Sequence, residues 1–247
     1  RSPQSTSRRQ RQMCIRDRLT PLESFTSIFD RAASRKGGAA AFTSLLDATV
    51  SEPLPTKQLL KVSDAEILSE MTKCVFRSGF VWKIIEAKWP GFEKAFHQFD
   101  VTRCAMLSDE ELEKLQTNAE IVRHGQKIRS VPTNAQYVLA VRAEHGSFAQ
   151  FLAAWPEGDV VGLWHELKVR GSRLGGQTGR YLLRFIGYDT PMLSADVVQA
   201  LIAAGVVDKV PTGKRALQQT QAAFTHWQEE SGCSYNRISR VLACSVP

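Results

Sequence analysis

The string RLGGQTGR, in the C-terminal half of the chain, contains residue types that bind phosphate groups. Gly175, Gly176 and Gly179 allow a turn whose backbone amides point at one anion, and a helix after the turn adds the positive end of its dipole. Arg173 and Arg180 flank this turn and supply positive charge for a nucleic-acid backbone without reading its sequence. The pattern indicates an anion site, and the alternative interpretation is an ordinary glycine-rich turn at a helix junction.

Other common chemistries lack their residue patterns. The string GGQTG has neither the lysine nor the preceding strand that a nucleotide-binding loop requires. His97, His145, His165 and His226 show no spacing typical of metal ligands. The five cysteines are scattered and form no CxxC pair, which suits a reducing cytoplasm. No run approaches the roughly 20 apolar residues that would span a bilayer, so we expect no membrane association.

Capping residues predict where several helices begin. In a capping box, a hydroxyl accepts a hydrogen bond from a first-turn amide while the carboxylate three residues later reaches back to the cap. Asp159 is a candidate cap of the simpler kind. The capping pairs in this chain are Ser63 with Glu66, Ser108 with Glu111, and Ser147 with Gln150.

The spacing of apolar residues is helical through most of the chain, and alternating strand patterns are nearly absent. The fold class is therefore predicted to be all-α. Residues 19–60 are harder to interpret, because glycines and prolines interrupt the part from 37 to 57. The predicted helices cover residues 25–35, 63–76, 80–89, segments beginning near 108, 147 and 159, and residues 177–186, 195–204, 214–230 and 234–243.

Three strings resemble a known family. FHQFD, which ends at Asp100, and IVRHGQKI, which ends at Ile128, are similar to the middle of the DNA-3-methyladenine glycosylase I family. RGSRLGGQTGRYLL is similar to the helix-hairpin-helix turn of the same superfamily, with Thr178 and Tyr181 in the expected places. The similar regions cover about residues 63–205. The resemblance implies one helix-hairpin-helix DNA glycosylase-like domain over residues 19–247, with a cleft between two lobes.

The resemblance also implies a base pocket. Trp82 lies where the family keeps a tryptophan that stacks on an extruded base, and Phe76 is a weaker companion on the same segment. By spacing alone, each aromatic residue is more typical of the core than of a pocket. Cys74, or Val75 after a shift of one residue, stands where the family has a glutamate that recognises alkylated adenine. A neutral thiol cannot favour a cationic base as a carboxylate does, and Cys74 is alternatively a plain buried residue.

Asp196 lies roughly where many relatives in the wider superfamily carry a catalytic aspartate. Its role would be to stabilise the positive charge that develops on the sugar, or to orient water. The alternative is an ordinary N-cap, with Ser194 or Asp196 at the start of a helix. The cysteine and histidine ligands of the family's zinc site are missing at both ends of the matched region, so we expect no metal and no cofactor.

The basic segment that precedes Ile128 matches the family as well. Arg123 and Lys127 are candidates for contacts with DNA phosphates or for packing between the lobes. His124 is a poor general base because the neighbouring Arg123 disfavours a second positive charge.

These features predict a monofunctional DNA base-excision repair glycosylase. It would act in the cytoplasm, as a monomer, on double-stranded DNA that contains alkylated purines such as 3-methyladenine. Residues 169–221 contain no lysine apart from Lys209 and Lys214, which argues weakly against Schiff-base lyase chemistry. One alternative is a DNA-binding module that has lost excision, which the missing glutamate favours. Another is a helical interaction domain without a nucleic-acid role.

Residues 1–18 contain six arginines and one aspartate, so the formal net charge of +7 falls to +2 for the remainder of the chain. Global charge is therefore weak support for DNA binding. This segment has few apolar residues and no periodicity, which predicts disorder. MCIRDR also resembles a translated sequencing adapter, so we interpret residues 1–18 as a non-native tail. A basic arm that binds phosphates is the alternative.

Overall fold

Every regular element of residues 22–247, the part of the chain that the structure describes, is a helix. The structure is a computed structural model, and it confirms the predicted all-α class. The tail of residues 1–18 lies outside the described residues. The elements are α2 (Phe25–Arg35), α3 (Ala39–Thr49), α4 (Thr56–Leu59), α5 (Asp64–Arg77), α6 (Trp82–Ala87), α7 (Trp89–Ala95), η1 (His97–Phe99), α8 (Val101–Ala105), α9 (Asp109–Thr117), α10 (Gly125–His145), α11 (Phe148–Ala153), α12 (Val160–Arg170), α13 (Gln177–Phe185), α14 (Ala195–Ala203), α15 (Lys214–Ser231) and α16 (Tyr235–Ser245).

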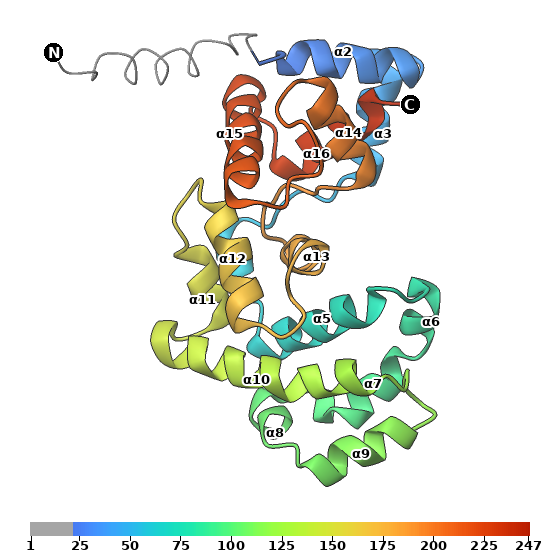
Figure 1. Cartoon of the computed structure of the whole chain (residues 1–247), viewed down its shortest axis with the longest axis vertical. Helices are drawn as coiled ribbons and strands as arrows, with labels where there is room; N and C mark the ends of the chain where they lie inside the picture. Colours follow the sequence, from blue (N-terminus) through green and yellow to red (C-terminus); the bar gives the residue numbers. More distant parts are fainter. Residues whose placement is uncertain (1–21) are drawn as a thin grey trace, which may run out of the picture.

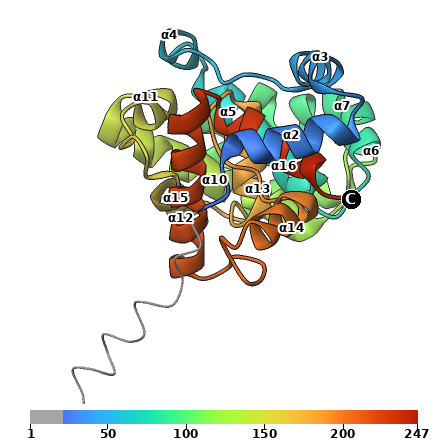
Figure 2. The same ribbon diagram turned by 90° about the horizontal axis from the view of Figure 1, so that it is seen from above.

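Both ends of the described chain meet in one lobe (Figure 1). Helix α16 packs against α2, α3, α14 and α15, and the view from above shows α2 crossing this group (Figure 2). Side chains of α15 fix the N-terminal helices in place. The Phe25 amide donates to Glu230 Oε2 at 2.8 Å, and Trp227 Nε1 donates to the Glu23 carbonyl at 2.8 Å.

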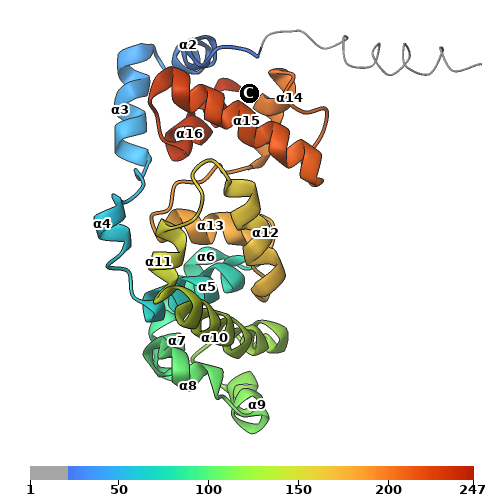
Figure 3. The same ribbon diagram turned by 90° about the vertical axis from the view of Figure 1, so that its left-hand side faces the viewer.

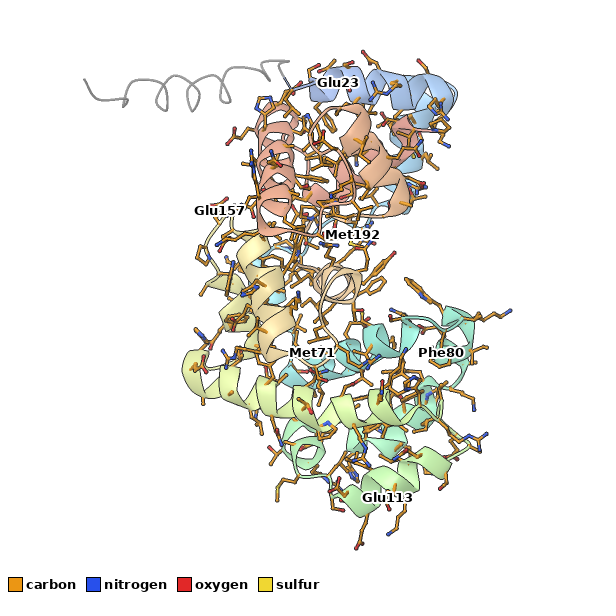
Figure 4. All side chains as sticks on the ribbon, viewed as in Figure 1. Glu23, Met71, Phe80, Glu113, Glu157 and Met192 are labelled. Atoms are coloured by element: carbon orange, nitrogen blue, oxygen red, sulfur yellow. The ribbon has the colours of Figure 1, made fainter. Side chains whose placement is uncertain are left out.

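Helices α5 to α10 form the second lobe, and α11, α12 and α13 lie between the two lobes (Figure 3). Helix α10 contacts α5, α8, α9 and α11, while α13 contacts both α5 and α12. Met71 and Met192 are buried in the interior, whereas Glu113 lies on the outer side of the second lobe (Figure 4). The chain therefore crosses between the lobes twice, through α4 and through α11 to α13.

The helix starts that side chains specify are confirmed. Two of the three predicted capping boxes are complete, at Ser63 and at Ser108. Ser147 accepts from the Gln150 amide at the start of α11, and Asp159 accepts from the Gly162 amide at the start of α12. These caps depend on hydrogen bonds within four residues, which explains why the local sequence predicts them.

Two helical segments differ from the predictions. The single helix expected over residues 80–89 is divided at Lys88 into α6 and α7, and Pro90 lies in the first turn of α7. Proline suits a first turn because its missing N–H has no helical partner there. The longest helix, α10, was not predicted at all. It contains Pro132, and its stability comes from a buried face that includes Val131, Ala135 and Val138.

The FHQFD string has a structural role in this fold. His97, Gln98 and Phe99 all have left-handed backbone conformations, with φ between 54° and 58°. This conformation is costly for side chains other than glycine. It places the buried rings of Phe96 and Phe99 in a stacked array with Trp89. Aromatic burial therefore offsets the local strain, and the string does not contribute to the cavity described below.

Asp64 and Asp109 allow a matched stability test, because each follows the cap of a capping box. Asp64 is 6% exposed, pairs with Arg142 at 2.7 Å and accepts from the Phe148 amide, whereas Asp109 is 87% exposed. We expect Asp64→Ala to lower the free energy of unfolding by about 3 kcal/mol, because it leaves the buried Phe148 amide and the partly exposed Arg142 without their partner. Asp109→Ala should cost less than about 1 kcal/mol in denaturant titrations. Equal losses would assign both effects to the helix ends alone.

Candidate functional site

A cavity of about 110 Å³ opens between α5, α6 and α13. Helix α13 packs across α5, and α6 follows α5 after a short turn. The end of α5, the first residue of α6 and one face of α13 supply its walls. The lining residues are Cys74, Arg77, Ser78, Trp82, Gln177, Thr178, Tyr181 and Phe185.

Three aromatic rings form one side of this cavity. Trp82 meets Tyr181 edge to face at a centroid distance of 5.3 Å and Phe185 at 6.0 Å. Tyr181 and Phe185 are stacked on each other, one turn apart on α13. Trp82 is 42% exposed and Phe185 is 43% exposed, which is unusual for residues of this size. The open rings provide a surface on which a planar group can stack.

The guanidinium of Arg77 lies over these rings, 5.0 Å from the centroid of Trp82 and 4.8 Å from that of Phe185. Glu70 and Glu86 hold it from the other side. Arg77 Nη1 donates to Glu70 at 3.2 Å, its Nε donates to Glu86 at 3.1 Å, and its Nη2 also donates to Glu86. The side chain is therefore fixed by two ion pairs and two aromatic faces.

The thiol of Cys74 lies in the wall of the cavity and is nearly buried. It donates to Glu70 Oε1 at 3.5 Å. Burial and the charge of Glu70 raise the pKa of Cys74, so the thiol is protonated at neutral pH. Sequence reasoning identified Cys74 as a pocket position. It missed Glu70, one helical turn earlier, which places a carboxylate behind the thiol.

Phe76 does not line the cavity. Its side chain is fully buried and packs edge to face against Phe92 at 4.6 Å. Phe76 and Val75 lie on the face of α5 that packs into the core, whereas Cys74 and Arg77 lie on the side that lines the cavity. This placement differs from the expectation that Phe76 accompanies Trp82 in a base pocket.

Lys127 holds the end of α5 and is not a surface contact. It is 4% exposed, and its ammonium donates to the carbonyls of Phe76 at 3.2 Å and of Ser78. The ammonium also lies 4.5 Å from the ring centroid of Phe80, which Figure 4 labels near α6. Burial, with the nearby charge of Arg173, lowers the pKa of Lys127 to about 8. Arg123, by contrast, is exposed in the turn before α10.

The glycine-rich turn connects α12 to α13 with a backbone that few side chains permit. Arg173 and Gly176 have φ values of 63° and 60°. A Cβ on Gly179 would lie 2.3 Å from the Leu174 carbonyl oxygen, so only glycine allows this close approach. Gly176 precedes α13 without a side-chain cap, which leaves the first-turn amides available to an anion.

Helix α10 positions this turn through one buried amide. Asn134 Nδ2 donates to the Ser172 carbonyl at 3.1 Å, and Asn134 Oδ1 accepts from the Ser172 amide at 2.7 Å. Arg173 Nη1 donates to Gln126 at 3.2 Å on the same helix. Arg173 is exposed, so its guanidinium is accessible to a phosphate.

Arg180 differs from Arg173 because it is buried. Its guanidinium lies 4.3 Å from the ring centroid of Trp164, and its Nη1 donates to Gln177 Oε1 at 3.1 Å. Its Nε has no hydrogen-bond partner, and burial lowers the pKa of Arg180 to about 10. In this structure Arg180 packs inside the hairpin, contrary to the expectation of a charge that flanks the turn at the surface. Gln177, which sequence reasoning missed, lies between Arg180 and the cavity, and its Nε2 donates to the Leu193 carbonyl.

Asp196 lies exposed in the first turn of α14. The cap of this helix is Ser194, which accepts from the Val197 amide at 3.3 Å. Asp196 is not among the residues that line the cavity. The hydrogen bonds therefore show that Ser194, and not Asp196, caps α14.

Metal ligands do not converge within residues 22–247. No group of three or more His, Cys, Asp and Glu side chains comes close enough there to hold a metal ion. The zinc site that the family resemblance implies does not fit the residues described. In the same range, no helix combines the length and the apolar character required to cross a bilayer.

Comparisons with known proteins point to one family. Residues 60–169 match the model of the methyladenine glycosylase family. A segment of 76 residues is 30% identical to DNA-3-methyladenine glycosylase 1 of Escherichia coli and 26% identical to DNA-3-methyladenine glycosylase of Haemophilus influenzae. The segment covers 31% of this chain, and only 41% of the length of each relative is matched.

Solved structures share the fold. The chain is similar to the crystal structure of an 8-oxoguanine DNA glycosylase from Methanocaldococcus jannaschii, with a TM-score of 0.50 and 14% identity. This similarity covers 87% of this chain and 92% of that protein. It confirms the predicted helix-hairpin-helix glycosylase-like architecture.

The two hairpin arginines should behave differently when they are replaced. We expect Arg173→Ala to weaken affinity for all duplex sequences and to reduce the salt slope by about one, with little change in melting temperature. Arg180→Ala should lower the free energy of unfolding by about 2 kcal/mol, because it removes the buried stem and the contact with Trp164. Salt-dependent fluorescence anisotropy and denaturant unfolding measure the two effects. A stable Arg180→Ala variant with lost DNA affinity would contradict this assignment.

Proposed function

Residues 60–169 match the model of the methyladenine glycosylase family, and on this basis we propose that the protein is a DNA base-excision repair glycosylase. Its reaction is hydrolysis of the N-glycosidic bond of alkylated purines such as 3-methyladenine. The partner is double-stranded DNA, and the protein acts as a monomer in the cytoplasm. The four cysteines of the described chain are free, in keeping with a reducing compartment.

One observation carries this proposal. The same helix, α13, supplies the open amides of an anion site at its start and a wall of the aromatic cavity along its side. An enzyme that acts on a base must extrude it from the duplex into a pocket. A phosphate bound at the turn would fix the backbone of the strand while the base beside it enters the cavity. The exposed ring of Trp82 would then replace the stacking that the base loses.

The chemical step needs little assistance when the base is already cationic. In a purine alkylated at N3 or N7, the electron pair of the broken bond neutralises a positive charge, and the departing base is a good leaving group. Water then attacks C1′ of the sugar. Asp196 is the candidate for stabilising the oxocarbenium-like sugar. A Schiff-base step is not proposed, because no lysine lines the cavity and the ammonium of Lys127 is buried on backbone carbonyls.

A second function, DNA binding without excision, is favoured by the protonated thiol of Cys74. A pocket whose wall carries no carboxylate makes weaker contacts with a cationic base. Such a module would bind distorted or alkylated DNA and leave every base attached. Release of free base from methylated DNA distinguishes the two functions.

Trp82 provides the first test of the enzyme. In this test the full chain is to be incubated with methylated DNA, and the released bases are to be measured by chromatography. Wild-type protein should release 3-methyladenine, and Trp82→Ala should release it at least tenfold more slowly, since stacking on an aromatic ring stabilises a base by roughly 1 to 3 kcal/mol. Affinity for undamaged duplex should persist through the hairpin. If wild-type protein releases no alkylated base, the binding module replaces the enzyme.

Asp196 is tested by single-turnover kinetics. Asp196→Asn keeps the size of the side chain but removes the charge that would stabilise the sugar cation. We expect a slower rate of excision, by about 100-fold, with substrate affinity nearly unchanged. Asp208→Asn, at another exposed aspartate, is the control. An unaltered rate for Asp196→Asn would leave catalysis to the pocket and the leaving group.

A further inference from the structure

Arg77 carries the formal charge of the cavity wall. None of the other lining residues has an acidic or basic side chain, and burial keeps the thiol of Cys74 protonated. Glu70 and Glu86 do not line the cavity, and both accept hydrogen bonds from Arg77. A base that enters the cavity therefore meets donors at this wall and no free carboxylate.

Some N–H groups of the Arg77 guanidinium are not used in hydrogen bonds. It possesses five N–H bonds, and three of its hydrogen bonds go to Glu70 and Glu86. The remaining two have no partner among the described residues. The two carboxylates and the rings of Trp82 and Phe185 fix the plane of the guanidinium, so little reorganisation precedes a new hydrogen bond. A preorganised donor in a partly enclosed site is the arrangement that stabilises developing negative charge.

We infer that the cavity also takes a neutral purine lesion that presents carbonyl and ring-nitrogen acceptors, and that Arg77 orients this base and stabilises it as it leaves. Hypoxanthine is the simplest base of this class. The inference rests on the proposed function, because it assumes that the cavity receives an extruded base. It differs from that function in the charge of the substrate.

The reaction is a hydrolysis that balances without any further co-reactant. The bond between C1′ and N9 breaks, and its electron pair goes to the base, which becomes anionic if it was neutral. Hydrogen bonds from Arg77 to the acceptors of the base offset this negative charge. Water adds to C1′, and the proton that it loses neutralises the departing base. Arg77 remains protonated throughout, and its contribution is electrostatic.

A cationic base requires no such stabilisation. Departure of 3-methyladenine removes a positive charge from the base, and a guanidinium nearby disfavours the cationic substrate before the reaction begins. The two substrate classes should therefore respond differently to replacement of Arg77. This difference separates a role in recognition and leaving-group stabilisation from a role in folding, which would affect both substrates equally.

The experiment compares two duplexes, one with a single hypoxanthine and one with 3-methyladenine, under single-turnover conditions. Arg77→Gln removes the charge, and Arg77→Lys keeps a cation for Glu70 and Glu86 if the first variant does not fold. Lys73→Gln is the control, because Lys73 lies on the same helix, 3.9 Å from Glu86, but does not line the cavity.

Wild-type protein should release both bases. Arg77→Gln should lower the rate of hypoxanthine release by about 100-fold, which is the effect expected when an enzyme loses one preorganised hydrogen-bond donor. The ratio of the hypoxanthine rate to the 3-methyladenine rate should fall at least about tenfold. Arg77→Lys should shift this ratio in the same direction, and Lys73→Gln should leave it unchanged. Equal losses on both duplexes would overturn the inference and assign Arg77 to the fold.

The two proposals fail separately. Release of 3-methyladenine without hypoxanthine overturns the inference and leaves the proposed function intact. Release of hypoxanthine alone supports the inference and overturns the preference for alkylated purines. Release of neither base overturns both proposals.

Discussion

The buried ammonium of Lys127 is the interaction on which the cavity depends most. It binds the carbonyls at the end of α5, where the chain must leave the helix and turn toward Trp82. The same helix, α10, holds the glycine-rich turn through Asn134, whose amide pairs with both backbone groups of Ser172. One rigid element therefore fixes the two walls of the cavity relative to each other. A long helix with one closely packed face can do this, because the side chains on that face have few alternative rotamers.

Charge placement in the cavity differs from what a cationic ligand would require. The thiol of Cys74 is buried and protonated, and Glu70 is directed to the thiol and to Arg77. The positive guanidinium, not a carboxylate, lies against the aromatic rings. Desolvation accounts for this arrangement, because a carboxylate in the wall would need a positively charged partner to remain ionised. In this cavity the positively charged guanidinium forms part of the wall itself. Substrate preference therefore depends on which side of the ion pair the base meets.

Local sequence was sufficient for those parts of the fold that depend on short-range hydrogen bonds. The capping boxes at Ser63 and Ser108 were predictable because each involves four consecutive residues. Helix α10 was not predictable in this way, because Pro132 argues against a helix interior and only burial of its apolar face compensates for the lost hydrogen bond. The strings that resemble the family pointed to the correct architecture, although FHQFD proved to serve aromatic packing.

The sequence by itself determined the all-α class, the helix starts that side chains cap and the glycine-dependent turn. Only the tertiary structure decided which candidate side chains meet. Phe76 and Arg180 lie on buried faces, while Arg77 and Gln177 line the cavity. The reason is physical: caps and turns form within a few residues, whereas the cavity joins positions about 100 residues apart, and that register is set by burial across helix interfaces.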